Sequence, residues 1–88
     1  MKLVSIIDYG CGNIRSVFNA FNAIREKKNI KVLVTSQEKE IKRANYLVLP
    51  GVGSFESCIK GLKKSNLLGI ITQKVKDDYV PFLGICVG

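Results

Sequence analysis

Short apolar runs alternate along this chain with segments in which apolar residues recur every three or four positions. The runs predict four β-strands, at residues 3–7, 30–34, 46–49 and 82–85. The first run fits a strand that is buried on both faces of a sheet. Pro50 and Gly51 are expected to stop the third strand, and Pro81 is acceptable at the entry to the fourth.

The segments with helical spacing predict helices between these strands. Residues 14–24 carry one apolar face behind Asn13, which is placed to cap the helix, and residues 36–43 predict a short polar helix. Ser54 and Asn66 are expected to cap two further helices after the third strand. The inner face of the second of these is expected to carry Leu67, Ile71 and Val75.

Strands that alternate with helices predict right-handed crossovers, and therefore an α/β fold with a parallel sheet and helices on both faces. Eighty-eight residues allow one domain at most. The fourth strand ends close to Gly88, the last residue of the sequence, and doubly wound sheets rarely finish on an apolar strand without a covering helix. We therefore expect an incomplete sheet and a truncated chain.

Composition and charge narrow the classes of function. No apolar run approaches the roughly 20 residues of a membrane helix, and the N-terminus lacks signal-peptide features, so a cytoplasmic protein without membrane contact is expected. The three cysteines lack the spacing of a metal or redox motif, which argues against a disulfide framework or a metal site. The net charge of +7 comes from dispersed groups of lysines. Solvated outer faces are therefore favoured over the alternative, nucleic-acid binding.

The last five residues, Gly84 to Gly88, have the G-x-C-x-G spacing of a nucleophile elbow. In such an elbow the nucleophile, here Cys86, sits on a tight strand-to-helix turn for which the flanking glycines leave room. A helix that follows the turn lowers the pKa of the thiol, and the backbone N–H of Val87 can donate to an oxyanion. Taken alone, the pattern also fits a buried structural cysteine, which is the commoner case.

Glycine-containing segments follow two other strands. Residues 50–54 lie at the carboxyl end of the third strand, where open α/β sheets bind ligands, and glycines there let backbone N–H groups approach an oxyanion. A plain strand-to-helix turn is the alternative. Residues 10–13 follow the first strand, but Arg15 occupies the last glycine position of the dinucleotide fingerprint, and no Walker A sequence is present. Nucleotide binding is therefore not expected.

Three segments together, Ile7 to Val17, Leu49 to Phe55 and Pro81 to Gly88, resemble the class I glutamine amidotransferases in order and spacing. The elbow is common to that family, whereas D-Y-G-x-G-N and P-G-V-G-x-F are similar to the glutaminase subunits of imidazole glycerol phosphate synthase. The resemblance spans essentially the whole chain. It implies an incomplete flavodoxin-like amidotransferase domain, with residues 1–88 as its N-terminal part, and it implies no cofactor.

The resemblance also implies roles for single residues. Cys86 is the nucleophile that attacks the side-chain amide of the substrate, glutamine. The oxyanion is held by backbone N–H groups of Gly51, Val52, Gly53 and Val87. The ammonia passes to a cyclase subunit that forms imidazole glycerol phosphate for histidine biosynthesis. Asn13 is a candidate contact with that partner in a heterodimer.

The family's catalytic histidine and glutamate lie downstream of the cysteine, beyond residue 88, and this sequence contains no histidine. The 88 residues alone are therefore expected to be inactive, because nothing in them can act as the usual general base for the Cys86 thiol. Two alternatives stay open at this point. One is a paralogous subunit whose partner amidates a surface-polysaccharide sugar, and the other is a non-catalytic flavodoxin-like binding module.

Overall fold

The computed structural model describes residues 2–10, 14–51, 55–77 and 79–85 of the chain. Four parallel strands form one sheet in the order β2-β1-β3-β4. The strands are β1 (Lys2–Ile7), β2 (Ile30–Thr35), β3 (Tyr46–Pro50) and β4 (Phe82–Ile85). The four predicted strands are confirmed, and each predicted bound lies within one residue of the observed one.

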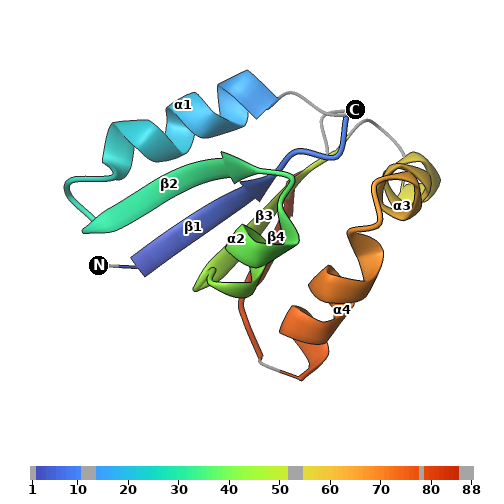
Figure 1. Ribbon diagram of the computed structural model, residues 1–88. Coiled ribbons are helices and arrows are strands. Elements are labelled where there is room, and N and C mark those ends of the chain that lie inside the picture. Colours follow the sequence, from blue (N-terminus) through green and yellow to red (C-terminus); the bar gives the residue numbers. More distant parts are fainter. Residues whose placement is uncertain (1, 11–13, 52–54, 78, 86–88) are drawn as a thin grey trace.

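Helices cover both faces of this sheet. They are α1 (Ile14–Ile24), α2 (Glu38–Lys42), α3 (Phe55–Lys64) and α4 (Leu68–Lys76). Figure 1 shows α1 over one face of the sheet and α2 and α4 over the other. The predicted open α/β class is therefore confirmed, and the strand order matches the first four positions of the flavodoxin-like order. In the part of the chain that the structure describes, no helix is long and apolar enough to cross a membrane.

The strand β1 contributes to two apolar cores, because successive side chains of a strand point to opposite faces. Val4 and Ile6 pack on the side of α1, and Ile7 packs on the side of α2 and α4. All four residues from Val4 to Ile7 are buried, as predicted for a strand covered on both faces. The burial of β1 fixes the position of its carboxyl end, from which the first candidate segment begins.

The buried face of α4 differs from the prediction. Leu67 and Ile71 are buried as expected, but Val75 is exposed and Lys74 is buried. The Lys74 ammonium donates a hydrogen bond to the backbone carbonyl of Lys42 at the end of α2, with 2.6 Å between Nζ and O. The last carbonyls of a helix lack intrahelical donors, so a lysine from a neighbouring helix is favourable there. This contact explains why a charged side chain occupies the inner face.

The predicted cap of Asn66 on α4 is wrong. Asn66 has a φ of 59° and its N–H donates to the Lys63 carbonyl at 3.2 Å, while the Leu67 N–H donates to the Leu62 carbonyl at 3.0 Å. This pair of bonds is a Schellman motif, which ends α3. The N-cap of α4 is Leu67, without a side-chain cap bond. Asparagine tolerates the left-handed region and also caps helix starts, so its type alone does not say which end it marks. The other two predicted caps, Asn13 and Ser54, lie outside the described residues.

Candidate active site

The carboxyl ends of β1 and β3 meet at a topological switch point. The strand order β2-β1-β3-β4 places β2 beside β1 and β4 beside β3, on the outer sides of this pair, so the connections that leave β1 and β3 run in opposite directions. Open α/β sheets bind ligands in the crevice outside the carboxyl ends of strands at such a point. Two predicted segments begin there, the first at Gly10 after β1 and the second at Gly51 after β3.

The turn after β1 is held by two hydrogen bonds. The Asp8 N–H donates to the Thr35 carbonyl at 2.8 Å, which extends the pairing with β2. The Gly10 N–H then donates to the Asp8 carboxylate, with 3.2 Å between N and Oδ1. Gly10 has a φ of 89°, in the left-handed region that favours glycine. Asn13, the predicted contact with a partner, lies beyond this turn and outside the described residues.

The end of β3 is buried beside β4. Pro50 pairs with Ile85, and both Pro50 and Gly51 are buried. Ile85 directly precedes Cys86 in the sequence, as Pro50 directly precedes Gly51. The register therefore places the residue before the predicted nucleophile beside the residue before the predicted oxyanion segment, at the usual strand spacing of about 4.7–4.9 Å. Of the predicted site residues only Gly51 is described, and Val52, Gly53, Cys86 and Val87 lie outside the described residues.

Tyr9 is a further residue of this edge, and its contact was not predicted from the sequence. Its side chain is 5% exposed and packs among apolar residues of β1, β3, α3 and α4. Its hydroxyl donates a hydrogen bond to the carbonyl oxygen of Pro50, so the bond joins the carboxyl ends of β1 and β3. A buried tyrosine hydroxyl usually finds an acceptor. A tyrosine directly after a buried strand was the available signal, although it does not say which acceptor is bound.

Cavities lie at both ends of the strands. A cavity of about 450 Å³ opens at the carboxyl edge and includes the turn after β1. It is lined by Asp8, Tyr9, Gly10, Ser36, Gly61, Lys64 and Ser65.

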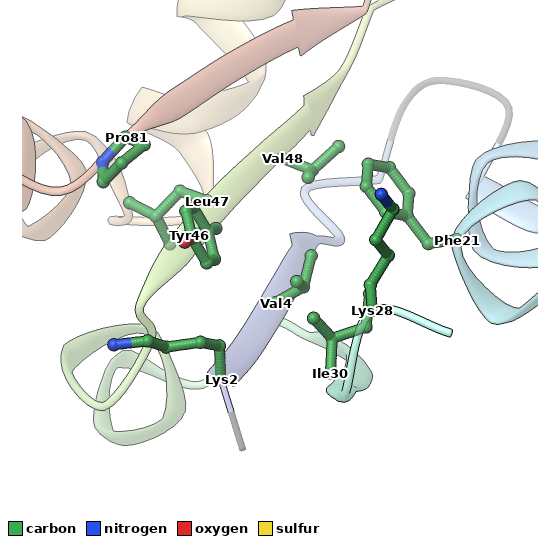
Figure 2. Close-up of a pocket in the computed structure, with 9 residues that line it drawn as sticks. All are labelled: Lys2, Val4, Phe21, Lys28, Ile30, Tyr46, Leu47, Val48 and Pro81. Carbon is green, nitrogen blue, oxygen red and sulfur yellow. The ribbon is translucent and has the colours of Figure 1, made fainter. Parts of the chain in front are cut away.

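A second cavity, of about 400 Å³, lies toward the amino ends of the strands on the α1 side (Figure 2). Val4, Tyr46 and Phe21 line it, and the side chains of Lys2 and Lys28 also reach it. This second cavity is at the end of the sheet opposite to the candidate site, so the two do not share residues.

The predicted lysine groups lie on the exposed surface. Two of these lysines form i,i+4 ion pairs along their helices, Lys42 with Glu38 at 3.9 Å and Lys60 with Glu56 at 3.6 Å. Exposed pairs of this kind contribute little stability. The lysine and arginine residues of these groups are all exposed: Lys27, Lys28 and Lys31 in the first group, Lys39, Lys42 and Arg43 in the second, and Lys60, Lys63 and Lys64 in the third. They have the character of solvated outer faces.

Curated relatives match this chain along nearly its full length, although no family model matches it. The imidazole glycerol phosphate synthase subunit HisH of Geobacter metallireducens is 42% identical over 88 residues, which cover 100% of this chain and 40% of the relative. The subunit HisH of Rhodopseudomonas palustris is 43% identical over 88 residues, with 97% and 41% covered. The subunit HisH 2 of Methanococcus maripaludis is 40% identical over 86 residues, with 98% and 41% covered. The chain thus spans about two fifths of the length of these relatives.

Proposed function

This chain is a homologue of the HisH subunits of imidazole glycerol phosphate synthase, and on that premise we propose that it carries the nucleophile and the oxyanion segment of a glutaminase. The proposed reaction is the hydrolysis of glutamine to glutamate and ammonia. A cyclase subunit, bound as the partner of a cytoplasmic heterodimer, then uses the ammonia to form imidazole glycerol phosphate in histidine biosynthesis. Residues 1–88 form the N-terminal part of the amidotransferase domain in this proposal.

The observation that carries the proposal is the pair between Pro50 and Ile85. The two segments that resemble the amidotransferase site are far apart in the sequence, and this pair gives them a common starting point at the carboxyl edge of the sheet. A nucleophile and oxyanion donors must both lie about 3 Å from the reacting carbonyl group. Neighbouring strand ends are compatible with this requirement, which supports the proposal.

The proposed chemistry follows the usual course of a thiol nucleophile. A general base removes the proton of the Cys86 thiol, and the thiolate attacks the side-chain amide carbon of glutamine. The negative charge moves to the amide oxygen, which backbone N–H groups of Val87 and residues 51–53 stabilise. The C–N bond breaks, the nitrogen takes up a proton and leaves as ammonia, and a glutamyl thioester remains. Water then attacks the thioester, releases glutamate and restores the thiol.

The base in this scheme lies outside these 88 residues. The sequence contains no histidine, and the three cysteines offer no substitute. Removal of the thiol proton by a positioned base contributes typically 10²–10⁴-fold to a rate. We therefore propose that residues 1–88 supply the attacking atom and part of the oxyanion site and that they are inactive alone.

The two alternatives are less well supported. A non-catalytic binding module gives no reason for an elbow sequence to follow the strand that pairs with the predicted oxyanion segment. A paralogous subunit for a surface-polysaccharide sugar would share the same motifs, but the relatives reported above carry the name of the imidazole glycerol phosphate synthase subunit. The histidine pathway is therefore the favoured assignment.

The test uses the complete gene product together with the cyclase subunit of the same organism. Cys86→Ala is expected to abolish release of glutamate from glutamine, and formation of imidazole glycerol phosphate from added ammonia should continue. Cys58→Ala, a cysteine in α3 that lies outside the three segments of the resemblance, is the matched control and should keep both activities. Glutamine hydrolysis by Cys86→Ala at the parent rate would refute the nucleophile assignment. Glutamine-dependent activity with a sugar-modifying partner, and none with the cyclase, would favour the paralogue.

A further inference from the structure

We propose that Tyr9 is a positioning residue of the glutaminase site, whose hydroxyl fixes the peptide group between Pro50 and Gly51. This inference rests on the proposed function, because it gives the fixed peptide a role in binding the oxyanion. The observation behind it is the buried hydrogen bond from the Tyr9 hydroxyl to the Pro50 carbonyl oxygen, between residues 41 positions apart.

The bond replaces strand pairing that has already ended. β1 pairs with β3 only from Val4 with Tyr46 to Ile6 with Val48, so Pro50 lies two residues beyond the last pair. Proline has no backbone N–H, and its carbonyl oxygen is therefore its one backbone group that can form a hydrogen bond. The Tyr9 hydroxyl supplies the donor from the β1 side of this strand end.

Fixing the carbonyl of Pro50 also fixes the N–H of Gly51. None of the described peptide bonds is cis, and a trans peptide group is planar, so its C=O and N–H point in opposite directions. Rotation of this peptide would break the bond to Tyr9. The Tyr9 hydroxyl reaches Pro50 from the β1 side of β3, and β4 lies on the other side of β3. The Gly51 N–H is therefore directed away from the Tyr9 hydroxyl, toward the side of β3 on which β4 lies.

The tyrosine ring is itself held in place. Tyr9 is 5% exposed and belongs to a core cluster that includes Ile7, Leu47 and Leu62. A phenylalanine at this position would keep that packing and remove the hydroxyl alone. The substitution Tyr9→Phe thus separates the hydrogen bond from the apolar contacts of the ring.

The experiment compares Tyr9→Phe with Tyr79→Phe in the complete gene product bound to its cyclase subunit. Tyr79 is 85% exposed, so its substitution makes the same chemical change without removing a buried contact. Preorganised donors act on the transition state, so Tyr9→Phe should lower kcat for glutamine hydrolysis about tenfold and change KM less than about twofold. Turnover with added ammonia should not change. An unaltered kcat for glutamine, in protein shown by its unfolding curve to be folded at the assay temperature, would overturn the proposal.

A binding measurement provides a second readout. The γ-aldehyde analogue of glutamine can form a tetrahedral adduct with a thiol nucleophile, and its oxygen would occupy the oxyanion position. Tyr9→Phe should weaken this binding about tenfold, in line with the loss in kcat, while Tyr79→Phe leaves it unchanged. Equal affinity in both variants would overturn the positioning role.

The Cys86→Ala variant separates the two proposals. If it still hydrolyses glutamine, the proposed function fails; if it is inactive while Tyr9→Phe keeps the parent rate, only the role of Tyr9 fails.

Discussion

Replacing Gly10 by alanine tests the backbone turn that connects β1 to the candidate site. Gly10 has a φ of 89°, and a methyl group built on its Cα would meet no atom of the described residues within 4 Å. The expected effect is therefore conformational and not steric. Gly69, the second residue of α4, is the matched control because its added methyl group would also meet no described atom within 4 Å, and its φ is not positive.

The two substitutions should change stability in opposite directions. A left-handed backbone costs an L-residue about 1–2 kcal/mol. Replacing glycine also restricts the unfolded chain, which returns about 0.4–1 kcal/mol. Gly10→Ala should therefore lower the free energy of unfolding by about 1 kcal/mol. In a helix alanine is favoured over glycine by about 0.5–1 kcal/mol, so Gly69→Ala should raise the free energy of unfolding by about 0.5 kcal/mol near the helix end.

Urea denaturation of the two variants and the parent provides the measurement. We expect the midpoint of Gly10→Ala below that of the parent and the midpoint of Gly69→Ala above it, with equal slopes, which separates stability from a change in the exposed surface. The free energies of the two variants should differ by about 1.5 kcal/mol. If Gly10→Ala is as stable as the parent, the left-handed turn after Asp8 is not required, and the reasoning about this segment is wrong.

Two further predictions concern activity and the core. The 88-residue chain mixed with glutamine should release no glutamate above its own Cys86→Ala control in a coupled assay, because its sequence lacks a histidine base; release above that control would refute this. The buried hydroxyl of Ser5 has no hydrogen-bond partner among the described residues, so Ser5→Ala should leave the urea midpoint unchanged or raise it. Ser65→Ala, which removes a bond of 2.8 Å to the Gly61 carbonyl, should lose about 0.5–1.5 kcal/mol. An equal loss at Ser5 would show that its hydroxyl does form a bond.

The strands could be predicted from the sequence because burial on both faces leaves a plain signal. Residues 3–7 have one polar residue among apolar ones, and the strand they predict is an interior strand of the described sheet. The inner face of α4 was less predictable, since Lys74 lies there in place of Val75 and its ammonium is bonded to the Lys42 carbonyl. That contact depends on how α2 and α4 pack, so it cannot be derived from the spacing of residues along α4.

The segments of the candidate site could be predicted from the sequence, but the side-chain contact that holds one of them could not. The position of Gly51 at the end of β3 was predicted, because Pro50 and Gly51 mark a strand end in the sequence. The hydrogen bond from Tyr9 to Pro50 was not predicted, because its acceptor is a backbone carbonyl and every residue has one. The roles of Cys86, Val87, Val52 and Gly53 in catalysis, and of Asn13 at an interface, stay predictions.

The interior position of β1 has a consequence for synthesis on the ribosome. β1 is translated before the other three described strands, and β2 can pair with one of its edges as soon as Thr35 has emerged. Its other edge pairs with residues 46–48 of β3, which are translated later. If the strands pair in the order of their translation, a two-stranded sheet with an open apolar edge forms first, and such edges readily pair with other chains. The nascent chain passes this vulnerable stage only when the third strand has left the exit tunnel.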